Sequence, residues 1–227
     1  MRRSTLLYLL PVLAAAPLAA QAFEGTVMMR MPVGGTALTD AKYMIKGDKI
    51  AAIMTMGPGA GPMAGKEMRM ITDRTAMTMT MLIPIEMAGM KGMKQVIDLK
   101  KAAAAHTKTP VEAKALGTSD VVAGYKCDNF EITDGKRVST LCITRELGTF
   151  IYPSGGMMGR GGGDAPAWVT AMRDHPGFPL RVSDHDGKVI MEVTGVKKGN
   201  VPSDTFEIPE GYSDMGGMMG GRGGGGH

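Results

Sequence analysis

The two cysteines are the residues whose spacing most directly predicts a chemistry. Cys127 and Cys142 flank Asp134-Gly135, a preferred centre for a two-residue hairpin turn. With the turn centred there, facing residues have numbers that sum to 269, and the two cysteines lie directly opposite each other. Facing Cα atoms lie about 4.5–5.5 Å apart, a separation that a disulfide spans, and this register places the cysteines at the wider, hydrogen-bonded spacing. We therefore predict a Cys127–Cys142 disulfide.

A redox-active or metal-binding pair is the alternative role for these cysteines. The sequence has no C-x-x-C motif and no histidine close to either cysteine, so a structural bridge is favoured. Closing a loop of this size stabilises a fold by roughly 3 kcal/mol.

Methionine is the second residue type with chemical interest, because it makes up 23 of the 227 residues. Met77, Met79 and Met81 alternate with threonines, so a strand would place all three on one face of a sheet. We expect an apolar face to be built from strand methionines of this kind: Met54, Met56, Met68, Met70, Met77, Met79 and Met81.

Three interpretations of the methionines remain open at this point. They are core residues that replace leucine or isoleucine, or they line a pliable apolar surface for a lipid or acyl chain. The third interpretation is binding of Cu(I), which soft thioether ligands select, or scavenging of oxidants. Met54-x-Met56 is one pair of this type, and Met157-Met158 and Met218-Met219 lie in glycine-rich segments. Histidines do not cluster with any of them.

Catalytic constellations are missing from the sequence. The four histidines are dispersed (His106, His175, His185 and His227), and Asp184-His185-Asp186-Gly187 is typical of a turn, without the spacing of a zinc site. Ser154 is not in a G-x-S-x-G elbow, and no P-loop or dinucleotide motif follows a strand pattern. We expect no enzyme activity, no metal site and no cofactor.

The first 22 residues have the three parts of a secretory signal. Arg2 and Arg3 precede an apolar run over 6–18, and Ala20-Gln21-Ala22 is a cleavage site that leaves Phe23 first. An uncleaved anchor is the alternative, but the run is shorter than the roughly 20 residues that span a bilayer. We expect a periplasmic or secreted protein, and no later segment is apolar enough to cross a membrane.

The charge of the exported chain gives no case for a nucleic-acid partner. Loss of Arg2 and Arg3 lowers the formal charge from +4 to +2, which is too small to attract a polyanion. Arg160-Gly161-Gly162-Gly163 resembles RNA-binding tracts in composition only and is expected to be a flexible loop.

The elements expected to position these residues are mainly strands. Residues 23–214 are expected to form one β-rich domain, and 215–227 a disordered tail rich in glycine and methionine. A short helix is expected from the N-cap Asp164 to about Arg173. Residues 96–105 fit either a strand or a helix. Expected strands, the last being a final ordered element, are 24–31, 41–46, 49–56, 67–72, 76–83, 121–133, 136–145, 178–183, 188–196 and 205–212.

Several segments together resemble an exported bacterial family, domain of unknown function 4412. They are Phe23-Glu24-Gly25, Tyr43-x-x-Lys46-Gly47-Asp48-Lys49, Ala123-Gly124-Tyr125-Lys126-Cys127, Glu146-Leu147-Gly148, Phe178-Pro179-Leu180 and Phe206-Glu207-Ile208-Pro209-Glu210-Gly211-Tyr212. The family is similar to periplasmic lipoprotein carriers. The resemblance implies an incomplete β-barrel with helices in its open mouth, and an apolar ligand that it does not name. This chain departs in its methionine and glycine content and in having one clear lid helix, around 167–172. No functional residue is carried over.

Overall fold

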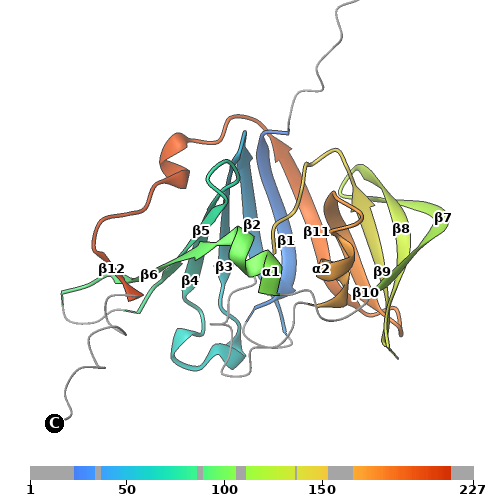
Figure 1. Ribbon diagram of the computed structural model, residues 1–227, viewed down its shortest axis with the longest axis horizontal. Coiled ribbons are helices and arrows are strands. Elements are labelled where there is room, and N and C mark those ends of the chain that lie inside the picture. Colours follow the sequence, from blue (N-terminus) through green and yellow to red (C-terminus); the bar gives the residue numbers. More distant parts are fainter. Residues whose placement is uncertain are drawn as a thin grey trace, which may run out of the picture.

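In the described part of the chain, short runs of alternating apolar and polar residues form twelve strands, and these strands make one open, curved sheet (Figure 1). The computed structural model describes residues 23–33, 37–85, 89–105, 111–135, 137–152 and 166–215. The mainly-β prediction, an incomplete barrel with short helices, is confirmed. The strands are β1 (Gly25–Pro32), β2 (Leu38–Lys46), β3 (Lys49–Thr55), β4 (Glu67–Asp73), β5 (Thr78–Ile83), β6 (Gly92–Asp98), β7 (Glu112–Val122), β8 (Tyr125–Asp134), β9 (Arg137–Thr144), β10 (Phe178–Asp184), β11 (Val189–Lys198) and β12 (Tyr212–Asp214).

The helices of the described segments are all short. They are α1 (Leu99–Ala105), α2 (Ala167–Ala171) and the 3-10 turns η1 (Pro58–Met63) and η2 (Ser203–Phe206). Among the described residues, no helix has the length and apolarity needed to cross a membrane. α1 and α2 lie on the same side of the sheet, which we call the inward face (Figure 1).

The strand order divides the sheet into two meanders that meet at β1. The order is β12-β6-β5-β4-β3-β2-β1-β11-β10-β9-β8-β7, so β1–β6 and β7–β11 each pair in sequence order. Neighbours are antiparallel except β12 and β6. Within the described residues, the ladders of β1–β6 keep one register. Shifts occur in the ladders β1–β11, β10–β11, β9–β10 and β7–β8. Because bulges bend strands, the local bends lie in the second meander and at its junction with β1.

The main core lies on the inward face. Residues directly opposite in neighbouring strands share a face, so single rows of side chains can be followed across the sheet. One row runs through Val27, Tyr43, Ala52, Met70 and Met81, from β1 to β5. All five side chains are at most 5% exposed. The inward face is therefore a continuous buried apolar surface.

A second, smaller core lies on the outward face. Ala51, Ile71 and Leu82 on β3–β5 pack with Val201 and Phe206, which come from the segment that includes η2. This segment follows β11 and leads to β12, so the last part of the chain stabilises the first meander from behind (Figure 1).

The disulfide hairpin has a different register from the predicted one. Asp134 pairs with Arg137, and Cys142 faces Asn129, so the turn is centred one residue later than Asp134-Gly135. Gly135 has φ +60° and supplies the positive φ that the first central position of such a turn requires. Asp134 instead flanks the turn, where its carboxylate accepts a hydrogen bond from Arg137 at 2.7 Å.

Other element predictions also need correction. The expected strand 121–133 is interrupted at Ala123-Gly124, both with positive φ, and the preceding strand β7 was not predicted. The expected final element 205–212 is instead η2 followed by β12. Residues 96–105 contain both the end of a strand and a helix, α1. The predicted helix is present as α2, with Pro166 at its N-cap position; Asp164 lies outside the described residues.

Candidate ligand-binding face

Five of the seven predicted methionines meet on the inward face. Met54 lies directly opposite Met68, and Met70 directly opposite Met81. Met79 is two residues from Met81 on β5 and therefore points to the same face. All five side chains are between 1% and 4% exposed. We call these five residues the methionine patch.

The other two predicted methionines lie outside the strands. Met56 follows the end of β3; it is half-buried and packs against the main core. Met77 lies in the turn before β5 and has φ 54°. The expected alternation therefore holds for Met79 and Met81 but does not extend to Met77. Met157, Met158, Met218 and Met219 lie outside the described residues, as do His106 and His227.

The buried inward face is covered by short segments. Leu147 and Phe150, in the loop after β9, belong to the same buried cluster as the methionine patch. So do Trp168 and Ala171 of α2, while Leu99 of α1 is partly buried against it. We call residues 147–152 the strap. The described part of the cover is thus one loop and two short helices.

Tyr43 fixes the strap to the sheet. Its hydroxyl accepts a hydrogen bond from the Ile151 backbone N–H at 2.9 Å and donates one to the Ile151 carbonyl oxygen at 3.3 Å. Tyr43 is 3% exposed, and burial raises the pKa of its phenol far above the ordinary value of about 10. Tyr43 is therefore a neutral latch between β2 and the strap.

Five aromatic rings fill the space between the strap, α2 and the sheet. Tyr43 contacts Phe150 and Phe178, with ring centroids 5.2 Å and 5.4 Å away. Trp168 of α2 contacts Phe150 and Tyr152 at 6.1 Å and 5.5 Å. The sequence pattern does not predict this cluster, because its members lie in four separate segments. A chain with only 5% aromatics offered one signal: Phe150, Tyr152 and Trp168 flank a single glycine-rich loop.

Two polar side chains described in the structure, Gln95 and Thr72, lie beside the methionine patch. Gln95 on β6 lies directly opposite Met81 and so shares its face. The Gln95 Oε1 atom is buried and has no hydrogen-bond partner among the described residues. Thr72, opposite Met79, is also buried. The patch therefore has an unmet hydrogen-bond acceptor at its β6 side.

The predicted disulfide is confirmed, and it lies on the other face of the sheet. Cys127 and Cys142 are bonded with Cα atoms 5.3 Å apart, although the register offsets them by two residues. Cys142 faces Arg181, which shares its face with Glu192. Arg181 lies 3.0 Å from Glu192 and 3.7 Å from Asp120. The bridge and these charges connect strands β7 to β11 on the outward face.

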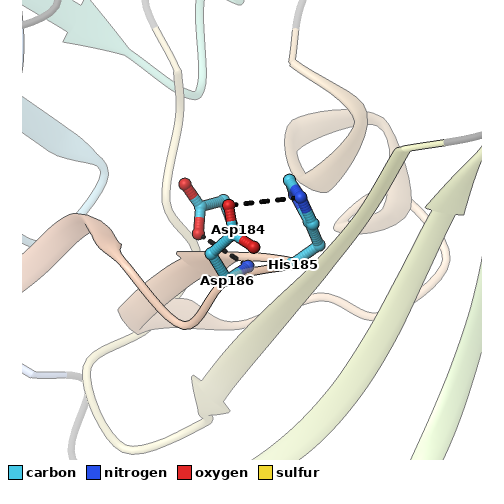
Figure 2. Close-up of side chains that lie close together, drawn as sticks. All are labelled: Asp184, His185 and Asp186. Carbon is cyan, nitrogen blue, oxygen red and sulfur yellow. Dashed lines mark hydrogen bonds and ion pairs between the residues drawn. The ribbon is translucent and has the colours of Figure 1, made fainter.

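The turn after β10 brings two aspartates and a histidine together (Figure 2). Asp184 Oδ1 accepts hydrogen bonds from the backbone N–H groups of Asp186 and Lys188, at 3.1 Å and 2.9 Å. His185 Nε2 lies 3.2 Å from an Asp186 carboxylate oxygen. The Asp184 carboxylate is thus engaged in forming the turn, as the sequence indicated.

These observations define a class of protein, an open half-barrel whose apolar inward face is covered. The sequence profile of the family described as "Domain of unknown function (DUF4412)" matches residues 23–212. The chain belongs to this family. No curated protein matches the sequence.

The search of solved structures found similar chains at low identity. PNGF-II is 14% identical with a TM-score of 0.49, over 85% of this chain and 30% of that chain. An uncharacterized conserved protein from Thermus thermophilus is 8% identical with a TM-score of 0.46, over 86% and 91%. The Pseudomonas aeruginosa MucA/MucB complex contains a chain 13% identical with a TM-score of 0.38, over 83% and 56%. This chain thus spans less than two thirds of PNGF-II and of the chain in the MucA/MucB complex. The family assignment rests on the profile match.

Proposed function

We propose that the methionine patch binds an apolar or lipid-like ligand after the protein has been exported to the periplasm or the medium. The observation that carries this proposal is that only short segments cover the inward face in the described structure. A buried apolar sheet face is covered, in the described structure, by a loop and two short helices. Segments of this size can move aside without unfolding the sheet beneath them.

Methionine suits a surface that packs against its cover when no ligand is bound and against the ligand when one is bound. Its side chain is unbranched and repacks at low cost, so five neighbouring thioethers can adapt to an inserted chain. Each methylene group that a ligand buries there contributes about 0.8 kcal/mol. An acyl chain is long enough to offset the loss of strap contacts.

The strap is the segment that we expect to move. Two hydrogen bonds connect it to Tyr43, and a typical hydrogen bond contributes about 0.5–1.5 kcal/mol net. Gln95 Oε1 would accept a hydrogen bond from a hydroxyl or amide group of the ligand, since it has no partner among the described residues. A lipid with one polar end near β6 fits both features.

Native mass spectrometry of protein purified from its own envelope fraction tests this proposal. We expect a co-purifying mass in the lipid range, which lipid extraction removes. The single tryptophan, Trp168, lies in the cover, so its fluorescence should change when a long-chain fatty acid is added. Met81→Leu should alter the affinity, whereas Met28→Leu, at a 41% exposed outward methionine, should not. A bare chain that binds no fatty acid would refute the proposal.

Cu(I) binding is a second candidate, and it rests on the cross-strand pairs. Met54 faces Met68 and Met70 faces Met81, so four thioethers lie in two adjacent rows. Thioether sulfur is a soft ligand that selects Cu(I). Stoichiometric copper in the same purified sample, lost in Met54→Leu and retained in Met28→Leu, would favour this role. Absence of both lipid and copper would favour a structural role in the envelope.

A further inference from the structure

β7 is an unusually exposed strand at one edge of the sheet. It is the last strand in the sheet order and pairs on one side only, with β8 (Figure 1). Nine of its eleven residues are exposed, and Val121 is 70% exposed. The outer edge of such a strand carries unpaired backbone N–H and C=O groups that can pair with another strand. No described strand of this chain occupies that edge.

The sequence of β7 is complementary to itself in the antiparallel direction. If two copies pair about Gly117, facing residues have numbers that sum to 234, and Lys114 of one copy lies opposite Asp120 of the other. The two-fold symmetry creates this pair twice. Ala113 then faces Val121, which would cover that exposed side chain. Opposite charges on directly facing residues stabilise a strand pair.

The faces of the sheet agree with this register. Lys114 pairs with Glu131 and Asp120 with Cys127, and these β8 residues are four apart and share one face. Ala113 pairs with Ile132 and Val121 with Lys126, on the opposite face. A two-fold axis perpendicular to the sheet keeps each face on its own side, so every facing pair of side chains meets on the same face.

The hydrogen-bonding pattern agrees as well. The β7–β8 register shifts between Ala115 and Ser119, and facing numbers sum to 245 before the shift and 247 after it. The two sums differ by two. In both halves of β7, the residues whose backbone N–H and C=O groups point to the free edge are therefore either all odd-numbered or all even-numbered. In the proposed dimer, facing residue numbers have an even sum, 234. Residues whose backbone N–H and C=O groups point to the free edge of β7 in one copy therefore face residues of the same kind in the other copy. The bulge around Gly117, with φ 69°, lies at the symmetry axis, between the two paired halves.

The charged partners are available for this contact. The Lys114 side chain is exposed and makes no ion pair or hydrogen bond with a described residue. The Asp120 side chain is 51% exposed and lies 3.7 Å from Arg181, so it can still contact a second cation. We propose that the β7 edge is a self-association surface, through which two copies of this chain form a continuous antiparallel sheet centred on Gly117.

Light scattering and sedimentation of the purified protein over a concentration series test this proposal. We expect a dimer that dissociates on dilution, because a two-strand contact is smaller than the interface of an obligate dimer. Lys114→Asp and Asp120→Lys should each raise the dissociation constant about tenfold or more, since each places two like-charged pairs at the contact. Lys42→Asp is the matched control, because Lys42 is exposed on β2, far from β7.

Mixing the two charge variants gives the decisive result. A Lys114→Asp copy has two acidic residues at the contact and an Asp120→Lys copy has two basic ones, so the mixture should form a heterodimer. This outcome also shows that both variants are folded. A protein that stays monomeric at high concentration would overturn the proposal. So would a dimer that is insensitive to either charge reversal, or a mixture that does not associate.

Discussion

The two meanders of the sheet are stabilised in different ways. In β1–β6 the inward face is rich in methionine, the ladders keep one register, and the segment around η2 packs on the outward face of β3–β5. In β7–β11 a disulfide crosses the outward face, and Phe178 contacts the aromatic cluster on the inward side. The first meander relies on adaptable side chains, and the second on a covalent bond and rigid rings.

The first meander thus provides a surface that can change shape, the methionine patch, and the second meander provides a rigid support. Methionine side chains can repack while the backbone ladders beneath them stay paired. A disulfide and packed aromatic rings have few alternative arrangements. The proposed ligand surface therefore lies in the first meander and the disulfide in the second, and the contact between Tyr43 and Phe178 joins the two meanders. Four variants test the contrast, from the largest expected effect to the smallest.

Phe178→Ala should have the largest effect. Phe178 is fully buried and its ring contacts Tyr43 and Phe150, so its loss leaves a cavity in the rigid meander and should cost about 3–5 kcal/mol of unfolding free energy. Urea denaturation measures this loss. Val96→Ala, at a 55% exposed position in the first meander, is the control and should change stability by less than about 0.5 kcal/mol.

Removal of the disulfide should rank next. The bridge joins residues 15 apart, so the double variant Cys127→Ala, Cys142→Ala should lose about 3 kcal/mol. Chemical denaturation with and without a reducing agent measures the effect. The reductant should destabilise the wild-type protein and leave the double variant unchanged. Equal stability of all four samples would mean that the bridge does not constrain the second meander.

Tyr43→Phe should cost about 1–3 kcal/mol, because the Ile151 N–H loses its hydrogen-bond acceptor. Faster hydrogen exchange at Ile151 and a change in Trp168 fluorescence would show that the strap has loosened. Tyr125→Phe is the control, since the Tyr125 hydroxyl makes no hydrogen bond with a described residue.

The same substitution has a pH signature. Burial holds the pKa of Tyr43 above its ordinary value in the folded state. The unfolded chain therefore releases this proton at lower pH, and the stability that neutral Tyr43 contributes is lost as the pH rises above about 10. The unfolding free energy of Tyr43→Phe should decline less steeply in that range. Parallel curves for variant and wild type would contradict the buried neutral phenol.

Met81→Leu should have the smallest effect on stability, less than about 1.5 kcal/mol, because the two side chains are similar in volume. Thermal denaturation measures it. The informative result is the pairing of this small change with a clear change in fatty-acid affinity. A large loss of stability would instead indicate that the patch is as rigidly packed as the aromatic cluster.

Much of the fold followed from local patterns, and the errors have identifiable causes. The alternation of Met79 and Met81 with threonine predicted their shared face, because period two is a direct property of strands. β7 was missed because an edge strand exposed on both faces has no apolar alternation to detect. The turn at Gly135 was displaced by one residue because Asp-Gly marks a turn without fixing which residue is central.

The sequence predicted only one of the two parts of the candidate site. The methionine patch consists of strand residues with a regular pattern, which can be predicted from the sequence. Its cover depends on Tyr43 meeting Ile151, which lies 108 residues later in the chain. A contact between a strand and an irregular loop has no periodic signal, so neither the latch nor the aromatic cluster was predicted.

The position of β1 between β2 and β11 has a consequence for how the chain reaches this structure. Gly25 pairs with Ile45 on one side and with Lys198 on the other, and the second partner lies 173 residues away in sequence. Closing so long a loop slows folding, because its entropy is lost before the contact forms. During synthesis, β1 therefore completes its pairing only after β11 has been made. The two meanders therefore cannot be joined until the chain is almost complete.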